Sequence, residues 1–381
     1  MTTPTQDSSP VSQLRSIRGA VLQTVGSARP YSTSRPILVR DLLLESPGAG
    51  EVTVRIEAAG ICHSDLSVVN GVRPRPVPML LGHEAAGIVE DIGTEVDDLA
   101  VGDRVVMTFL PRCGDCAGCR SNGRIPCSVG TQANNAGRLM GGAIRLSADG
   151  DPVRHHLGVS GFATQAVVSQ RSVVKVGSDV PAAVAAIFGC ALLTGGGAVL
   201  NVLKPGPDDS VAVVGLGGVG MAALVTAVAT GVRNIVGIDS DPAKLEIATS
   251  LGAGAVYAPQ DAVAAGVKVT GAVEAAGHPR AVETAVAVTA VGGTTVTVGL
   301  PAPGGHSCID PLALVAEART IVGSYLGSAV PAVDIPIYER LWRDGRLNVD
   351  GLISSTVALD DINEAMDALA DGRALRQVIT F

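Results

Sequence analysis

The pattern of hydrophobic and polar positions changes at about residue 181. Between residues 16 and 110, short runs rich in Val and Ile, such as 52–56 and 86–90, are separated by Gly, Pro and Asp. Short apolar runs bounded by turn residues are typical of β-strands. We therefore predict that the first part of the chain is rich in strands and tight turns.

After residue 181, strand-like and helix-like runs alternate. An apolar strand at 210–214 leads through a glycine-rich turn into a helix at 221–230, and a strand follows at 234–239. Proline in the first turn marks the next helix, at 242–248. Alternating strands and helices predict a parallel sheet with right-handed crossovers. We expect further strands at 271–274, 294–298 and 376–381, and helices at 335–344 and 361–370.

Two apolar stretches raise the question of membrane insertion. Residues 182–200 and 211–229 contain no charged side chain, and their length approaches that of a membrane span. The second stretch contains the glycine-rich turn, and a strand buried on both faces followed by a packed helix has the same hydropathy. We therefore predict buried core and no membrane partner. Residues 1–15 are polar, which predicts a loose tail and excludes a signal peptide.

Length and charge narrow the class of protein further. A chain of 381 residues exceeds the usual size of one hydrophobic core, so we expect two domains. The net charge of −8 and the lack of a basic patch exclude nucleic acid as a partner. We expect a cytoplasmic protein, in which clustered cysteines bind metal more often than they form disulfides.

The glycine-rich turn fits a dinucleotide-binding motif. Residues 215–220 read G-L-G-G-V-G, follow a predicted strand and open a predicted helix. In such a motif Gly215 makes the tight turn, Gly217 lets the backbone approach the pyrophosphate, and Gly220 allows the helix to pack closely on the strand. Asp239, at the end of the next strand, can accept hydrogen bonds from the adenosine-ribose hydroxyls and would repel a 2′-phosphate. This favours NAD over NADP; the alternative is a glycine turn in the core with no ligand.

Four of the seven cysteines form a compact array. Cys113, Cys116, Cys119 and Cys127 have the spacing C-x2-C-x2-C-x7-C, and glycines at 114, 118 and 123 let the loop fold tightly. Four thiolates match a closed, tetrahedral structural zinc site. An iron–sulfur ligand set and redox cysteines are the alternatives.

Two further cysteines lie far apart and require another ligand. The motifs G-I-C-H-S-D at 60–65, G-H-E at 82–84 and G-C-A-L-L-T-G at 189–195 supply Cys62, His83 and Cys190. A site with three protein ligands leaves one position on zinc open for water or substrate. Each residue alone also fits ordinary packing. The remaining cysteine, Cys308, is interpreted as a packing or surface residue without a metal.

Taken together, these motifs resemble those of the zinc-dependent medium-chain alcohol dehydrogenases over roughly residues 16–381, including the tail R-Q-V-I-T-F at 376–381. The segment 131–170 resembles the long, liver-type members. The resemblance implies an α/β fold with two domains. The β-rich, GroES-like catalytic domain, at 1–191 and 326–381, is expected to be a partly open barrel, and the cofactor domain at 192–325 is expected to have a Rossmann fold. It also implies two zinc ions per chain, NAD, a small-molecule alcohol or aldehyde substrate, and a homodimer, with a homotetramer as the alternative.

The resemblance assigns roles to single residues. Cys62, His83 and Cys190 correspond to ligands of a catalytic zinc, Asp65 to the carboxylate that orients the histidine, and Glu84 to a carboxylate behind the metal. Ser64 corresponds to the hydroxyl that takes the alcohol proton. The implied cofactor contacts are His63, Thr194, Gly215, Gly217, Gly218, Val219, Gly220, Asp239, Lys244 and Arg376. The implied substrate pocket contains Phe109, Leu157, Leu300 and Tyr325.

Two departures from the family pattern leave questions open. Ser67 stands where many relatives carry a histidine that ends the proton relay, so we predict slower proton release. Arg73, Gln132 and His156 stand where relatives often carry apolar residues. Either these loops are shifted and the polar ends face solvent, or the pocket prefers polar or carboxylated alcohols.

Several functions compete with a simple alcohol dehydrogenase. The long form is shared with formaldehyde dehydrogenases that act on a glutathione or mycothiol adduct. A related alternative holds NAD tightly and passes electrons to an external acceptor. A zinc- and NAD-binding structural or redox-sensing protein without turnover belongs to a different class, and the complete ligand sets argue against it.

Overall fold

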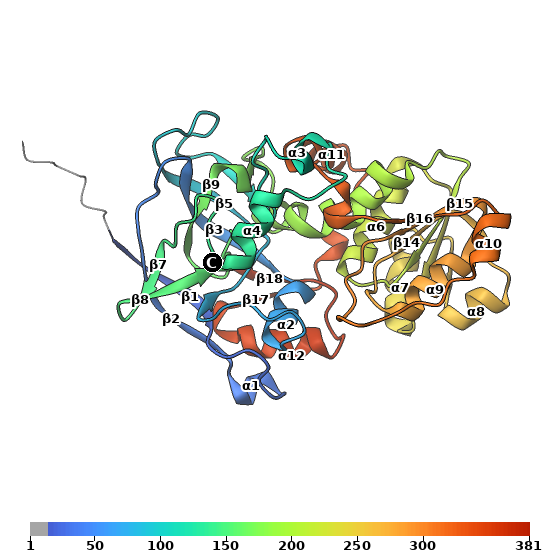
Figure 1. Ribbon diagram of the computed structural model, residues 1–381, viewed down its shortest axis with the longest axis horizontal. Helices are drawn as coiled ribbons and strands as arrows, with labels where there is room; N and C mark the ends of the chain where they lie inside the picture. The colour runs from blue at the N-terminus through green and yellow to red at the C-terminus, as the bar shows by residue number, and fades with distance from the viewer. Residues whose placement is uncertain (1–13) are drawn as a thin grey trace, which may run out of the picture.

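The computed structural model describes residues 14–381, so almost all of the predicted tail at 1–15 lies outside the described residues. Figure 1 shows two parts side by side. One is β-rich and combines the first half of the chain with its C-terminal end. The other contains a parallel sheet covered by helices. The two-part organisation follows the sequence, and the division at single residues stays a prediction.

Two sheets form the β-rich part. The first sheet closes on itself, because the short strand β4 pairs with both β1 and β8. This differs from the partly open barrel that the sequence led us to expect. The strands of the first sheet are β1 (Arg15–Leu22), β2 (Ile37–Leu44), β7 (Leu146–Ala148), β8 (Asp151–His155) and β4 (Met79–Leu80). The second sheet consists of β10 (Val173–Lys175), β6 (Arg104–Met107), β5 (Ala85–Ile92), β3 (Glu51–Ile61), β18 (Gln377–Thr380) and β17 (Ser355–Val357), with β9 (Gln165–Ser169) paired to β3.

The long strand β3 organises the second sheet. It pairs with β5, β9 and β18, so segments from both ends of the chain share one sheet. Val52, Val54 and Ile56 are fully buried, as the Val- and Ile-rich pattern predicts. Short helices cover the edges of this part: α1 (Tyr31–Ser34), α2 (His63–Val69), α3 (Ala117–Arg120), α4 (Ser128–Ala136) and α12 (Ile362–Ala370).

The second part is a six-stranded parallel sheet in the order β13-β12-β11-β14-β15-β16. Numbered within this part, the order is 3-2-1-4-5-6, which defines the Rossmann fold and confirms the predicted fold class. The strands are β11 (Ser210–Val214), β12 (Asn234–Ile238), β13 (Ala255–Tyr257), β14 (Val269–Glu274), β15 (Thr289–Thr297) and β16 (Thr320–Gly323). The helices are α6 (Gly218–Thr230), α7 (Pro242–Ser250), α8 (Pro259–Ala264), α9 (Pro279–Val288) and α10 (Pro311–Ala316).

A long apolar helix joins the two parts. It runs through α5 (Ala182–Ile187) and the π-helical segments η2 (Phe188–Gly196) and η3 (Ala198–Leu203). Among the described residues it is the one helix long and apolar enough to cross a membrane, but 89% of its most apolar window is buried inside the fold. It therefore acts here as a core helix. The predicted boundary between residues 191 and 192 falls within it.

The segment after residue 325 returns to the β-rich part. It contains η4 (Tyr325–Ser328), α11 (Pro331–Arg343), η5 (Asp350–Leu352) and η6 (Leu359–Asp361), and it ends with α12 and β18. Both helices predicted here are present, and the final strand pairs with β3. This return brings Arg376 beside the junction of the two parts.

Candidate active site

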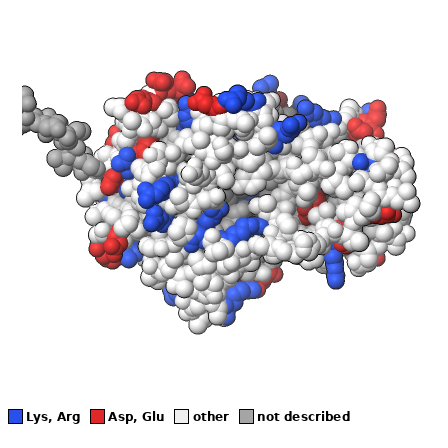
Figure 2. All heavy atoms as spheres, in the orientation of Figure 1, with Lys and Arg blue, Asp and Glu red and all other residues white. Residues whose placement is uncertain are grey.

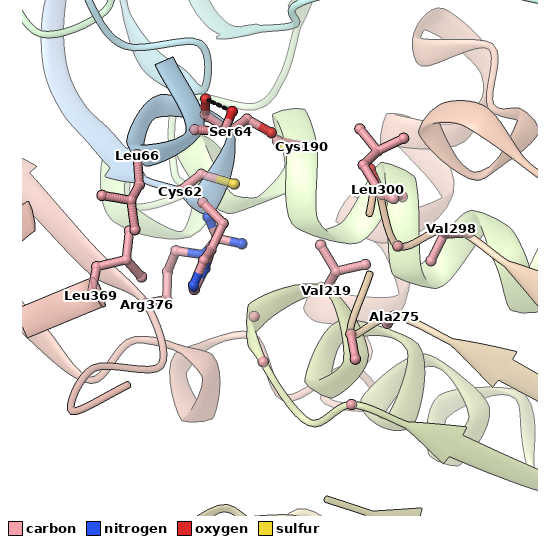
Figure 3. Close-up of a pocket in the computed structure, with 18 of the residues that line it drawn as sticks. Cys62, Ser64, Leu66, Cys190, Val219, Ala275, Val298, Leu300, Leu369 and Arg376 are labelled. Carbon is pink, nitrogen blue, oxygen red and sulfur yellow. Dashed lines mark hydrogen bonds between the residues drawn. The ribbon is translucent and has the colours of Figure 1, made fainter. Parts of the chain in front are cut away.

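A cavity of about 450 Å³ lies between the two parts. This is the carboxyl edge of the parallel sheet, where ligands of such folds usually bind. In Figure 3, Cys62, Ser64 and Arg376 lie on one side of the cavity, and Val219, Val298 and Leu300 lie on the other. Residues of both parts therefore line a single site.

Cys62, His83 and Cys190 meet beside this cavity although they come from three distant segments. Cys62 precedes α2, His83 lies in the turn between β4 and β5, and Cys190 lies in η2. Their ligand atoms all lie within 4.8 Å of one another, and Cys190 Sγ is 3.4 Å from His83 Nε2. A tetrahedral zinc site with one sulfur and one nitrogen ligand requires about 3.5 Å between those two atoms. The three side chains therefore fit a zinc ion.

Asp65 fixes the orientation of His83 from behind. Asp65 Oδ1 is 3.0 Å from His83 Nδ1, and the same carboxylate accepts hydrogen bonds from the N–H groups of Cys62 and Gly82. Burial alone would raise the pKa of Asp65, but His83 and His156 lower it to about 2. An ionised Asp65 keeps the proton of His83 on Nδ1, so Nε2 offers its lone pair to a metal.

The surroundings favour a thiolate at Cys62, whereas the hydrogen bond with Cys62 and burial raise the pKa of Cys190. The hydrogen bond from Cys190 lowers the pKa of Cys62 well below its usual value, and Arg376 and His83 lower it further, against the effect of burial. Glu84 lies beneath, with Oε1 2.6 Å from Arg376 Nη1. Burial raises the pKa of Glu84 to about 7, although Arg376 opposes the shift.

His156 occupies a place that the sequence did not predict. Its side chain is 1% exposed, so it does not face solvent, and its Nδ1 lies 3.1 Å from Asp65 Oδ1. The ring packs edge-on against His83, with centroids 5.6 Å apart. Gln132 is exposed on α4, in agreement with the interpretation that the polar ends of these side chains face solvent. The sequence marked His156 only as a polar residue where relatives are often apolar, and nothing in its spacing pointed to Asp65.

Ser64 lines the cavity at the start of α2. Ser67 lies one turn later, and its hydroxyl donates a hydrogen bond to the backbone carbonyl of Ser64 over 2.7 Å, drawn as the dashed line in Figure 3. The Ser67 hydroxyl is therefore engaged with the helix backbone.

Aromatic and aliphatic side chains surround the open side of the three ligands. The Phe109 ring packs edge-on against His83 at 5.6 Å and against Tyr325 at 6.0 Å. Tyr325 and Leu300 also line the cavity. Leu157 is buried in the same hydrophobic cluster as Phe109 but does not line the cavity, so its role in the pocket stays a prediction. Val72, Ala275 and Val298, for which the sequence predicted no role, also line the cavity.

The glycine turn lies at the other end of the cavity. Gly215 has φ +91°, and a Cβ there would lie 2.5 Å from the N atom of Ala276. A Cβ on Gly217 would meet nothing within 4 Å, so the backbone is open toward the cavity. A Cβ on Gly220 would overlap the carbonyl oxygen of Gly215, which explains the close approach of α6. The Arg376 guanidinium lies over Gly218, beside the helix N-terminus.

Asp239 lies beside this turn, directly after β12. Its carboxylate accepts hydrogen bonds from the N–H groups of Leu216, over 2.7 Å, and Asp241, over 3.0 Å. Lys244 Nζ is 3.9 Å from Asp241 Oδ2. Asp239 and Lys244 both line the cavity, and so do the other predicted cofactor contacts His63, Thr194 and Val219.

The four clustered cysteines form a separate metal-ligating lobe. Cys113 Sγ is 3.8 Å from Cys119 Sγ, and Cys116 Sγ is 3.9 Å from Cys127 Sγ. Tetrahedral zinc with four sulfur ligands requires about 3.8 Å between sulfurs. The ligand atoms lie within 4.8 Å of one another, so this lobe also fits a zinc ion.

Comparison with known proteins shows that two segments of this chain match known protein families. Residues 48–179 match the family described as alcohol dehydrogenase GroES-like domain, and residues 218–341 match zinc-binding dehydrogenase. The geraniol dehydrogenase of Castellaniella defragrans is 36% identical over 377 residues, covering 96% of this chain and 98% of the relative. This chain belongs to the zinc-dependent medium-chain alcohol dehydrogenase family.

Two solved structures resemble this alcohol dehydrogenase family member over nearly its whole length. An alcohol dehydrogenase zinc-binding domain protein from Burkholderia ambifaria has a TM-score of 0.90 and 32% identity, covering 97% of this chain and 100% of the other. Benzyl alcohol dehydrogenase from Acinetobacter calcoaceticus has a TM-score of 0.88 and 33% identity, covering 96% and 99%. The family and these relatives support an oxidoreductase that acts on small-molecule alcohols.

Proposed function

We propose that this protein is a zinc- and NAD-dependent alcohol dehydrogenase that oxidises a primary or secondary alcohol to an aldehyde or ketone. One observation carries the proposal. The ligand atoms of Cys62, His83 and Cys190 converge beside a cavity whose other end is the glycine turn and Asp239. A metal at one end and a dinucleotide along the rest of the cavity would bring the alcohol and the cofactor together.

Each bound group supplies a defined chemistry. When bound by these three ligands, zinc would supply Lewis-acid chemistry at the alcohol oxygen, and NAD would supply the hydride acceptor. The protein holds the ion with Cys62, His83 and Cys190 and fixes the imidazole through Asp65. The rings of Phe109 and Tyr325 pack edge-on against each other and form an aromatic wall of the cavity. In the second lobe, the four cysteines at 113–127 would hold a structural zinc ion, because their sulfurs lie close enough to share one metal.

Ser64 takes the proton that the alcohol loses. Its hydroxyl lines the cavity, and because its own pKa is far from neutral it must hand the proton on at once. The Ser67 hydroxyl is engaged with a backbone carbonyl, so the proton leaves through water, the cofactor ribose or His63.

NAD is the cofactor that Asp239 favours. The carboxylate follows β12 and lines the cavity next to the glycine turn, where it can accept hydrogen bonds from the ribose hydroxyls. Its negative charge disfavours a 2′-phosphate. Fluorescence titration should show NADH binding more tightly than NADPH; tighter binding of NADPH would contradict this part of the proposal.

The pocket and the relatives favour an alcohol with an unsaturated or aromatic carbon beside the hydroxyl. Geraniol dehydrogenase and benzyl alcohol dehydrogenase are named for such alcohols, and Phe109 and Tyr325 supply aromatic walls. A spectrophotometric screen of NAD reduction with benzyl alcohol, geraniol, hexanol and 2-propanol tests the substrate class. The same screen includes formaldehyde with glutathione or mycothiol, and an artificial electron acceptor. Activity only with the thiol, or only with the acceptor, would replace the proposal by the corresponding alternative.

The protein works as a cytoplasmic homodimer in this proposal. β16 is an edge strand of the parallel sheet, and exposed apolar side chains lie on neighbouring segments: Val291 is 73% exposed, Leu312 75% and Val315 78%. Such side chains on α10 and at the start of β15 suit a contact with a second copy. Light scattering during size-exclusion chromatography should give twice the chain mass, and a monomer would contradict the dimer.

A further inference from the structure

Arg73 lies at the mouth of the cavity, where the two parts face each other. It follows α2 in the β-rich part and lines the cavity. One guanidinium nitrogen, Nη2, contacts the carbonyl oxygens of Leu300 and, over 3.2 Å, Pro301 in the Rossmann part. The positive charge therefore stands between the two walls of the cavity, with its remaining N–H groups free of any hydrogen bond to the described residues.

This arginine has no carboxylate partner. Within residues 14–381, neither Arg73 nor its neighbour Arg75 forms an ion pair, and Arg75 contacts only the carbonyl oxygen of Asn134 and the side chain of Asn135. The other arginine of the cavity, Arg376, is paired with Glu84. Fully buried charges in proteins are almost always paired, since an unpaired charge is costly to remove from water. Arg73 is only partly buried, and its guanidinium, held by two backbone carbonyl oxygens, is available to an anion that enters the cavity.

The electrostatics at this end of the cavity are positive in a protein of net charge −8. Burial lowers the pKa of Arg73 and so does the neighbouring charge of Arg75, whereas Tyr325 and Cys62 act in the opposite direction. Asp239 is the single carboxylate among the residues lining the cavity in the described chain, and it lies at the glycine turn. Figure 2 shows a row of Lys and Arg side chains that crosses the β-rich part toward the junction. The charges of Arg73 and its neighbour Arg75 would attract an anion to this end of the cavity.

The wall between Arg73 and the three metal ligands is apolar. The Phe109 ring contacts His83 on one side and Tyr325 on the other, and both arginines influence the pKa of Tyr325, which burial raises. A molecule that fills this space has its hydroxyl near the metal ligands, an apolar middle and an anionic far end.

We infer that the preferred substrate is an alcohol that carries a carboxylate at the end opposite the hydroxyl, bound by Arg73. The inference rests on the proposed function and adds a substrate class to it. The hydroxyl-bearing carbon loses one hydride to NAD and its oxygen loses one proton, while the carboxylate is unchanged. The same chemistry is present in a hydroxy acid and in the hydroxymethyl adduct of formaldehyde with a carboxylated thiol such as glutathione.

The test compares matched alcohols that differ in one charge. We expect wild-type kcat/KM to be at least about 10-fold higher for 4-(hydroxymethyl)benzoate than for 4-methylbenzyl alcohol, since charged hydrogen bonds contribute about that factor. Arg73→Gln keeps a donor for the Leu300 carbonyl but removes the charge, so it should abolish the preference while changing the neutral substrate less than about threefold. Arg73→Lys should keep part of the preference.

Arg138→Gln is the matched control. Arg138 is exposed, and like Arg73 it donates to a backbone carbonyl, that of Gly142, and has no ion pair in the described chain. This variant should keep the full preference. Formaldehyde with glutathione, assayed beside the hydroxy acid, identifies which of the two carboxylate sources is used.

Three results would overturn the inference. The first is an equal wild-type kcat/KM for the two benzyl alcohols. The second is an equal loss of kcat/KM for both alcohols in Arg73→Gln, which would make Arg73 only a contact between the two parts. The third is loss of the preference in Arg138→Gln. In each case the neutral alcohol is still oxidised and the proposed function stands. No NAD reduction with any alcohol would instead contradict the proposed function.

Discussion

The two cysteine sites of this molecule are built in opposite ways. The lobe takes its four sulfurs from one loop at 113–127, and three of those cysteines are only partly buried. The site of Cys62, His83 and Cys190 draws on three distant segments and is wholly buried. The lobe therefore depends on local sequence and the other site on the whole fold. The compact cysteine motif therefore indicates a metal site, whereas the dispersed set of three ligands also indicates the reaction, because it leaves a position on the metal open for substrate.

The two sites are nevertheless connected through one short helix. Cys127 precedes α4, and its sulfur accepts a hydrogen bond from the N–H of Gly130. Near the other end of α4, Asn134 Nδ2 donates to the backbone carbonyl of Phe109 over 2.6 Å. Phe109 in turn packs against His83. Folding of the lobe can therefore position an aromatic wall of the pocket.

The largest effect is expected from breaking the buried site. Cys190→Ser removes one of three ligands and should lower kcat/KM at least about 1,000-fold, because Lewis-acid stabilisation is worth several kcal/mol. Steady-state NAD reduction measures this loss. Cys308→Ser, at an exposed cysteine, is the matched control and should retain full activity. Equal activity of the two variants would remove Cys190 from the site.

A smaller loss is expected when the support of His83 is weakened. Asp65→Asn keeps the shape of the side chain but removes the charge that fixes the imidazole, so activity should fall about 10- to 100-fold. Asp360→Asn, whose carboxylate pairs with Arg18 at the surface, is the control and should leave kcat/KM unchanged. Zinc affinity, measured by competition with a chelator, should fall with activity; an unchanged affinity would contradict the role of Asp65.

The lobe should respond in stability more than in chemistry. Cys113→Ser breaks the four-sulfur set, so the variant should lose one zinc ion and melt at least about 5 °C lower, since a bound structural metal contributes directly to folding. The kcat of the protein that remains folded should fall less than about fivefold. Differential scanning fluorimetry and a metal count measure both quantities. A variant that melts like the wild type would show that the lobe does not hold a structural ion.

The smallest effect tests the connection between the two sites. Asn134→Ala removes the hydrogen bond to the Phe109 carbonyl, which should destabilise the fold by about 1–3 kcal/mol. With the aromatic wall less fixed, KM for benzyl alcohol should rise about threefold, while kcat and KM for ethanol stay the same. Gln132→Ala, at an exposed position of the same helix, serves as control. Equal changes for both alcohols would mean that Asn134 acts on stability alone.

Sequence predicted the fold class and most elements because their signals are local. The strand at 210–214, the glycine turn and the helix that follows are found where the hydrophobic period and the glycines indicated. The closed barrel was missed because it depends on β4, a strand of two residues with no period to detect. The π-helical form of η2 was missed for a similar reason, since its sequence is uniformly apolar.

The sequence predicted those residues of the candidate site that lie within recognisable motifs. Cys62, His83 and Cys190 were grouped from flanking motifs, and their proximity depends on the long strand β3 and the core helix. The contact of His156 with Asp65 and the hydrogen bond from Asn134 to Phe109 arise from loops that meet only in the folded chain. Neither residue type nor spacing carries that information.

The account is tested most directly by counting zinc ions beside NADH formation in the wild type, Cys190→Ser and Cys113→Ser. Two clusters of ligands fit zinc, so we predict two ions in the wild type and one in each variant. Activity should disappear in Cys190→Ser and persist in Cys113→Ser. Persisting activity in Cys190→Ser, or loss of activity in Cys113→Ser while the protein stays folded, would contradict the separation of one site for chemistry from one for folding.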